Sequence, residues 1–200
     1  MLFHSLYPKK LDVGCDEAGR GCMSGPVFAA AVILPKNFKN EWLNDSKKLT
    51  LSKRIELRKI IEENALSYAV AKCEVEEIDK INILNASILS MQKAINLMIE
   101  KGIIPDHISV DGNRFKSHQN IPHTTVIKGD GKYMNIAAAS ILAKTYRDDW
   151  MTKLHEEFPQ YFWNENKGYG TKKHVEAMIK YGRTIHHRKS FVLKSQMHLF

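Results

Sequence analysis

The feature that most constrains this chain is an uninterrupted run of apolar residues from Val27 to Leu34, which Pro35 ends. The run is far shorter than the ~20 apolar residues that a membrane-spanning helix needs. It has the length of a strand, and because no polar residue alternates within it, such a strand is buried on both of its faces. We therefore expect residues 27–34 to form a central strand of a sheet that other elements cover.

Strands and helices are both predicted along the rest of the chain, and the sequence contains no internal repeat. The first strands follow one another without an intervening helix, which favours a mixed sheet with helices packed on it over a strictly alternating fold. The other predicted strands are 11–16, 66–75, 107–111 and 124–127, and the predicted helices are 51–66, 86–101, 135–158 and a helix that starts at Thr171 as N-cap and ends before Gly182.

The chain is basic, with 30 Lys and Arg against 22 Asp and Glu and a net charge of +8. Residues 166–200 carry eight of these cations against one carboxylate, so nearly all of the net charge lies at the C-terminal end. A basic end on a nearly neutral body is typical of a protein with a polyanionic partner, most commonly nucleic acid. A solvated, solubilising surface is the alternative interpretation. In this stretch, His186 and His187 are interpreted as phosphate-facing or structural.

Other features exclude several classes of protein. Cys15, Cys22 and Cys73 form no CxxC pair, which predicts neither a disulfide framework nor a zinc knuckle. The first residues lack the basic start and apolar stretch of a secretory signal. We therefore expect a cytoplasmic protein that has no membrane partner, and nothing in the sequence indicates more than a monomer.

Carboxylates stand where several predicted elements begin or end. Asp16 and Glu17 follow the first strand, Asp111 ends the fourth, and Asp130 precedes the long helix. Each has a simpler explanation, namely a solvated turn for the first pair, an Asp–Gly turn for Asp111, and turn or helix-start chemistry for Asp130. Together they match what a two-metal phosphodiesterase requires, because hard divalent cations bind converging carboxylate oxygens.

Ordered sequence blocks resemble the type 2 ribonuclease H family, ribonuclease HII, over residues 11–191. The blocks are DEAGRG at 16–21 followed by GPV at 25–27, DSKKLT at 45–50, VDGN at 110–113, KGD at 128–130 with AAASILAK at 137–144, GYGT at 168–171, and HHRKSF at 186–191. The resemblance implies an α/β, ribonuclease H-like fold, with a five-stranded mixed sheet flanked by helices. It also implies a catalytic domain over 1–160 and a basic helical extension over 161–200 that belongs to the same globular unit.

The resemblance further implies the activity and its cofactor. The family cleaves the RNA strand of RNA–DNA hybrids, and single ribonucleotides embedded in duplex DNA, leaving 3′-hydroxyl and 5′-phosphate ends. Such an endoribonuclease removes ribonucleotides and processes primers during DNA replication and repair. Two Mg²⁺ or Mn²⁺ ions would be held by Asp16, Glu17, Asp111 and Asp130, which are the carboxylates already singled out.

The same resemblance assigns substrate contacts. The Gly19-Arg20-Gly21 segment would approach the 2′-hydroxyl, which is the group that distinguishes RNA from DNA, and Tyr169 would stack on the sugar at the RNA–DNA junction. Taken alone, Tyr169 is better explained as a turn aromatic that covers the core. The candidate phosphate contacts are Lys47, Lys48, Arg188 and Lys189.

Two further hypotheses remain open. The last residues, with Gln196, Leu199 and Phe200, resemble a short motif that docks bacterial replication proteins on the sliding clamp, although the apolar pair could instead fold back on the body. The rival functions are a non-catalytic nucleic-acid-binding module and another nuclease of the same superfold. All four carboxylates are present, which argues against the first, and the GRG and GYGT segments argue against the second.

Overall fold

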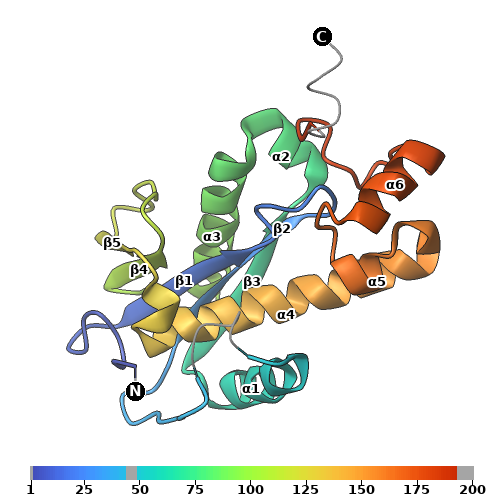
Figure 1. The fold of residues 1–200 in the computed structure, drawn as a ribbon. Coiled ribbons are helices and arrows are strands. Elements are labelled where there is room, and N and C mark those ends of the chain that lie inside the picture. The colour runs from blue at the N-terminus through green and yellow to red at the C-terminus, as the bar shows by residue number, and fades with distance from the viewer. Residues whose placement is uncertain (1, 44–48, 193–200) are drawn as a thin grey trace.

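A mixed sheet forms the centre of the protein in a computed structural model that describes residues 2–43 and 49–192 (Figure 1). The sheet has five strands, as predicted, and their order is β3-β2-β1-β4-β5. The first three pair antiparallel, whereas β1, β4 and β5 run parallel. The strands are β1 (Asp12–Ala18), β2 (Val27–Ile33), β3 (Ser67–Cys73), β4 (His107–Asp111) and β5 (His123–Val126).

Strand β2 is the apolar run of the sequence, and every residue in it is buried. Its alternate residues face different helices, because neighbouring strand residues point to opposite faces of a sheet. Ala29 and Ala31 pack with α3 (Ile83–Glu100), whereas Ala30 and Val32 pack with α4 (Met134–Glu157) and α1 (Leu51–Asn64). Helices therefore cover both faces, as Figure 1 shows, which explains the absence of polar residues from this strand.

Two short helices were not among the helices predicted from the sequence, namely α2 (Val75–Ile81) and α5 (Trp163–Asn166). The predicted third strand included Val75, but a capping box between Glu74 and Glu77 starts a helix at this point. Helix α2 ends at Asn82, where φ is +65°, and the Asn82 side chain then accepts a hydrogen bond from the backbone N of Asn85 at the start of α3. Helices α2 and α3 are thus separated by a single left-handed residue, which the periodicity does not reveal.

The C-terminal residues form short helices that pack on the far end of α4. They are the 3-10 turn η3 (Pro159–Tyr161), α5 (Trp163–Asn166) and α6 (Lys172–Tyr181). Thr171 caps α6 as predicted, since its side chain accepts a hydrogen bond from the backbone N of His174. No helix in the described part of the chain is long and apolar enough to cross a membrane. A cluster shared between these elements holds the extension in place, with Met151, Leu154, Tyr161, Trp163, Ala177 and Met178.

Helix α4 lies close to β1, and this contact positions the helix residues described below. A Cβ at Gly14 would lie 2.3 Å from the backbone carbon of Asn135 and 2.4 Å from the backbone nitrogen of Ile136. The Asn135 side chain donates to the carbonyl oxygen of Asp12 at 2.7 Å and accepts from the backbone N of Leu34 at 3.1 Å. The first turn of α4 is thereby joined to two strands.

We predict that Gly14→Ala lowers the free energy of unfolding by about 3 kcal/mol, because the added methyl group meets backbone that cannot move aside. Urea unfolding measures the change. Gly131→Ala is the control, since a Cβ there meets nothing within 4 Å and should change stability by less than about 0.5 kcal/mol. Equal stability of the two variants would show that β1 and α4 tolerate a wider separation.

Candidate active site

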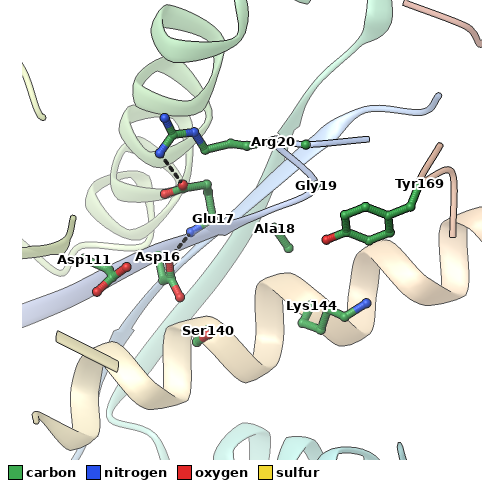
Figure 2. Close-up of a pocket in the computed structure, with 10 residues that line it drawn as sticks. Asp16, Glu17, Ala18, Gly19, Arg20, Asp111, Ser140, Lys144 and Tyr169 are labelled. Carbon is green, nitrogen blue, oxygen red and sulfur yellow. Dashed lines mark hydrogen bonds and ion pairs between the residues drawn. The ribbon is translucent and has the colours of Figure 1, made fainter. Parts of the chain in front are cut away.

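A pocket at the end of β1 gathers many of the residues that the sequence singled out (Figure 2). Its walls come from β1 and the turn after it, from the end of β4, from the middle of α4, and from the loop between α5 and α6. We call it the site pocket, and it is lined by Asp16, Glu17, Ala18, Gly19, Arg20, Gly21, Asp111, Ser140, Lys144 and Tyr169.

Asp16 is the most deeply placed carboxylate of the site pocket. It is 6% exposed and accepts a hydrogen bond from the backbone N of Glu17 at 2.7 Å. Burial raises the pKa of Asp16 well above its ordinary value, and the carboxylates of Glu17 and Asp111 raise it further, against a lowering by the hydrogen bond from Ser140. The pocket therefore concentrates more negative charge around Asp16 than the surrounding protein compensates.

Asp111 lies beside Asp16 because their strands are parallel neighbours. Cys15 pairs with Val110, and these are the residues that precede the two carboxylates. Asp111 Oδ1 accepts a hydrogen bond from the backbone N of Gly129 at 2.6 Å. The end of β4 is thereby joined to the short 3-10 turn η2, which spans residues 129–131 and precedes α4.

Asp130 is buried within η2, directly after the residue that bonds to Asp111. It is not among the residues that line the site pocket. Across residues 2–43 and 49–192, no three Asp, Glu, His or Cys side chains form a cluster that could hold a metal ion as they stand. The structure thus brings three of the four predicted carboxylates to one pocket. The fourth, Asp130, directly follows Gly129, which is hydrogen-bonded to Asp111.

The donor chemistry of the site pocket nevertheless fits a hard divalent cation. Mg²⁺ and Mn²⁺ prefer carboxylate oxygens and water as ligands, and Asp16, Glu17 and Asp111 supply such oxygens to one pocket. A cation between these groups would offset the mutual repulsion that raises the pKa of Asp16. These three residues are the ones that would hold such an ion.

The turn after β1 folds against the buried side chain of Arg147 from α4. The guanidinium donates to the carbonyl oxygens of Ser24 at 3.0 Å, Pro26 at 3.0 Å and Lys167 at 2.8 Å. Gly19 has a φ of +97°, and a Cβ there would lie 2.0 Å from Arg147 Nε, so only glycine fits. In the sequence, Arg147 forms an RD pair with Asp148 that also resembles the ribonuclease HII family, and the pair was interpreted as part of a salt-bridged helix face. The structure instead directs the Arg147 guanidinium to backbone carbonyl oxygens.

The prediction that Arg188 contacts phosphate is corrected by its position. Arg188 is fully buried and donates to the carbonyl oxygens of Gly19 at 2.7 Å, Arg20 at 2.9 Å, and Gly25 at 2.9 and 3.0 Å. Burial, and then repulsion from Arg147, lowers the pKa of Arg188 to about 10, which leaves the group charged at neutral pH. The guanidinium offers five donors, and the carbonyl groups of the turn use them in place of a phosphate.

Some of the other residues predicted to contact substrate lie within the described ranges and some do not. Lys189 is exposed, and Arg20 forms an ion pair with Glu17 at 3.1 Å. The predicted residues that fall outside the described ranges are Lys47, Lys48, Gln196, Leu199 and Phe200.

Tyr169 reaches the site pocket from the loop between α5 and α6, and Figure 2 shows its hydroxyl directed into the pocket. The residue is 44% exposed, so its ring is not a core residue. A Cβ at Gly21 would lie 3.9 Å from Tyr169 Cε1, which places the ring beside the glycine turn. The backbone of Tyr169 is held by His174, whose Nδ1 lies 2.8 Å from the Tyr169 carbonyl oxygen.

Two buried histidines connect this loop to the rest of the extension. His174 uses Nδ1 as a donor to that carbonyl, so its Nε2 accepts, and it receives the Trp163 Nε1–H at 3.1 Å. His187 Nδ1 accepts from the backbone N of Thr184 at 2.9 Å, so its Nε2–H donates to His174 Nε2 at 3.2 Å. Ser24 Oγ lies 3.1 Å from the same nitrogen. His187 is therefore structural, which was one of its two predicted roles.

The sequence of this chain is similar to those of known proteins over nearly its whole length. A family model described as Ribonuclease HII matches residues 13–194. The ribonuclease HII of Bacteroides thetaiotaomicron is 58% identical over 193 residues, covering 96% of this chain and 95% of that protein. The ribonuclease HII of Christiangramia forsetii is 61% identical over 190 residues, covering 94% of both.

Solved structures share the fold. The Archaeoglobus fulgidus ribonuclease HII in its complex with PCNA matches with a TM-score of 0.74 at 24% identity, over 92% of this chain and 96% of that one. The Pyrococcus horikoshii ribonuclease H2 also has a TM-score of 0.74, at 23% identity, over 94% and 97% of the two chains. At these identities the likeness concerns the fold alone.

We predict that His187 makes the protein less stable as the pH is lowered. Burial, followed by repulsion from basic neighbours, lowers the pKa of His187 to about 3, whereas an unfolded histidine titrates near pH ~6.5. Between these values the unfolded chain binds the extra proton, so the free energy of unfolding should fall by about 2 kcal/mol from pH 7 to pH 5 through this residue. His187→Asn keeps an acceptor for Thr184 and should flatten the slope in urea unfolding. Equal slopes would contradict the assignment.

Proposed function

This chain belongs to the ribonuclease HII family, and we propose that its site pocket cleaves RNA–DNA hybrids and single ribonucleotides within duplex DNA. Membership makes the chain a ribonuclease H, an endonuclease, whereas the finer substrates, the 3′-hydroxyl and 5′-phosphate ends, and a role in ribonucleotide removal and primer processing belong to the proposal. The observation that carries it is the meeting of three carboxylates, a glycine turn and Tyr169 in one pocket.

The carboxylates are proposed to bind Mg²⁺ or Mn²⁺, two ions per site, with Asp16, Glu17 and Asp111 as ligands and Asp130 as the fourth. When bound, such ions activate water and stabilise the leaving oxygen of a phosphodiester. The protein contributes the placement of Asp16 between two other carboxylates, and the Gly129 N–H that fixes the rotamer of Asp111. A Bst-RNase HIII structure of the same fold is in complex with Mn²⁺, at 16% identity, which supports the class of cofactor.

The glycine turn and Tyr169 are proposed to recognise the ribose. Because Gly19 and Gly21 carry no side chain, backbone groups of the turn can approach a sugar in the site pocket. The 2′-hydroxyl both donates and accepts hydrogen bonds, so backbone amides and the Tyr169 hydroxyl are suitable partners. A deoxyribose would leave these groups unpaired, which is how such a site rejects DNA.

Phosphate contacts are proposed for Lys189, Lys47 and Lys48. Lys189 is exposed and directly follows the buried Arg188, and Lys47 and Lys48 are retained as proposed contacts from the sequence. Lys144 lines the site pocket, although its Nζ is paired with Asp148 Oδ1 at 2.6 Å. Such contacts would give affinity without sequence preference.

We expect the protein to cleave a duplex that holds one ribonucleotide when Mg²⁺ is present, and not when it is removed by chelation. Asp111→Asn should lower turnover by more than about 100-fold, because loss of a ligand charge weakens capture of the cation, yet it should keep duplex affinity. Gel analysis with mapped ends measures cleavage, and filter binding measures affinity.

An all-DNA duplex of the same sequence is the control for this experiment. Cleavage of that control would favour another nuclease of the superfold. Binding of both duplexes without any cleavage would favour a non-catalytic module. Either result would contradict the proposed function.

We also propose that the C-terminus docks on the bacterial sliding clamp. The support is the Gln196, Leu199 and Phe200 pattern, together with the Archaeoglobus fulgidus relative that is in complex with PCNA. A partner bound through such a segment would hold the nuclease on DNA.

Deletion of residues 196–200 should weaken binding to the clamp by more than about tenfold, since it removes the apolar anchors of the motif. Cleavage of a short duplex should be unchanged. Surface plasmon resonance on immobilised clamp and the ribonucleotide cleavage assay measure the two effects. Clamp binding that survives the deletion would show that another surface is used.

A further inference from the structure

We propose that Asp79 on α2 is a positioning residue for the glycine turn, and that it acts through Arg188. The inference deepens the proposed function and rests on it, since it concerns how the ribose-recognising turn obtains its shape. Asp79 does not line the site pocket and has no contact with the turn itself among those the structure describes. Its effect must therefore pass through the C-terminal segment, residues 188–191.

Asp79 binds this segment with both carboxylate oxygens. Oδ2 accepts from the backbone N of Lys189 at 2.9 Å, and Oδ1 accepts from the backbone N of Ser190 at 2.9 Å and from its hydroxyl at 2.5 Å. Partial burial opposes ionisation of Asp79, but these hydrogen bonds outweigh it and lower the pKa of Asp79. The carboxylate is thus charged at neutral pH and fixes the two residues that follow Arg188.

Further contacts hold the same segment on the other side. The Arg183 guanidinium donates to the carbonyl oxygens of Arg188 at 3.1 Å and Phe191 at 2.9 Å, and the backbone N of Arg188 donates to Met23 at 2.9 Å. The Phe191 ring packs against the buried cluster that contains Ile78, which is the neighbour of Asp79 on α2. The segment is therefore anchored to α2 by one charged contact and one apolar contact.

Arg188 transfers this placement to the turn. Its guanidinium binds the carbonyl oxygens of Gly19 and Arg20, and in a trans peptide the N–H points opposite to the C=O. The N–H groups of Arg20 and Gly21 belong to these two peptides, so they point away from Arg188. Both residues line the site pocket, and their amides are the groups that a ribose hydroxyl can meet. Displacement of Arg188 would rotate both peptides.

The test compares Asp79→Ala with Glu76→Gln, a matched control that removes an exposed carboxylate from the same helix. We expect Asp79→Ala to lower kcat on the single-ribonucleotide duplex by about fivefold to tenfold, because hydrogen bonds to a charged group are lost. Affinity for an all-DNA duplex and the melting temperature should stay close to those of Glu76→Gln. A merely structural role would lower the melting temperature and not kcat at a temperature well below it.

A second readout does not depend on activity. In ¹H–¹⁵N spectra, Asp79→Ala should shift the amide resonances of Arg20 and Gly21, and Glu76→Gln should not. Arg188→Lys keeps the positive charge but loses the planar set of guanidinium N–H donors, so it should shift the same amide resonances. Its effect on kcat should not add to that of Asp79→Ala.

Two outcomes would contradict the inference, and a third concerns the proposed function alone. Unchanged amide shifts in Asp79→Ala overturn it, and so do additive effects of the Asp79 and Arg188 variants on kcat. If Tyr169→Phe cleaves the single-ribonucleotide duplex like the parent, ribose recognition by that residue is wrong. The amide shifts would still decide whether Asp79 positions the turn.

Discussion

Two guanidinium groups in the interior hold the turn that follows β1, and the geometry of the site pocket depends on them. Arg147 and Arg188 come from α4 and from the C-terminal segment, and together they donate seven hydrogen bonds to backbone carbonyl oxygens. A buried charge is costly unless it is hydrogen-bonded, and a glycine-rich turn has carbonyl groups that no ladder satisfies. The guanidinium groups therefore supply hydrogen-bond donors to the turn, and the carbonyl oxygens of the turn supply the acceptors that the buried charges need.

The topology of the sheet explains why the carboxylates meet beside this turn. Because β1 and β4 are parallel and adjacent, Asp16 and Asp111 lie side by side toward the C-terminal ends of the two strands. The buried cations contact the carbonyl side of the turn, whereas the carboxylates line the site pocket with Gly19 and Gly21. The turn thus lies between two buried guanidinium groups on one side and a pocket lined by three carboxylates on the other.

Much of the fold could be predicted from the sequence, since it follows from local patterns. The apolar run became β2, the N-cap at Thr171 started α6, and the carboxylates at the ends of β1 and β4 came together. The helix α2 was not predicted because its seven residues are too few to show a helical period. Its start depends on a capping box, and its end depends on the positive φ of Asn82.

Arg188 shows the limit of prediction from sequence more clearly. A basic residue in a basic stretch is expected to be solvated, and only the fold reveals that the turn, more than 160 residues earlier in the chain, offers it carbonyl groups. Arg147 stands beside Asp148 and Asp149 in the sequence, which favours a salt-bridged helix face, and only the fold shows that it is buried against carbonyl groups. The place of Asp130 also depends on η2, a turn whose bonding to Asp111 is tertiary and carries no sequence pattern.

The order of these parts along the chain has a consequence for protein synthesis. Residues 19–25 are made more than 160 residues before Arg188. Until that arginine emerges, the carbonyl groups of Gly19, Arg20 and Gly25 lack the donor that fixes them. A growing chain therefore cannot fix the shape of this turn until Arg188 has been made and has reached it.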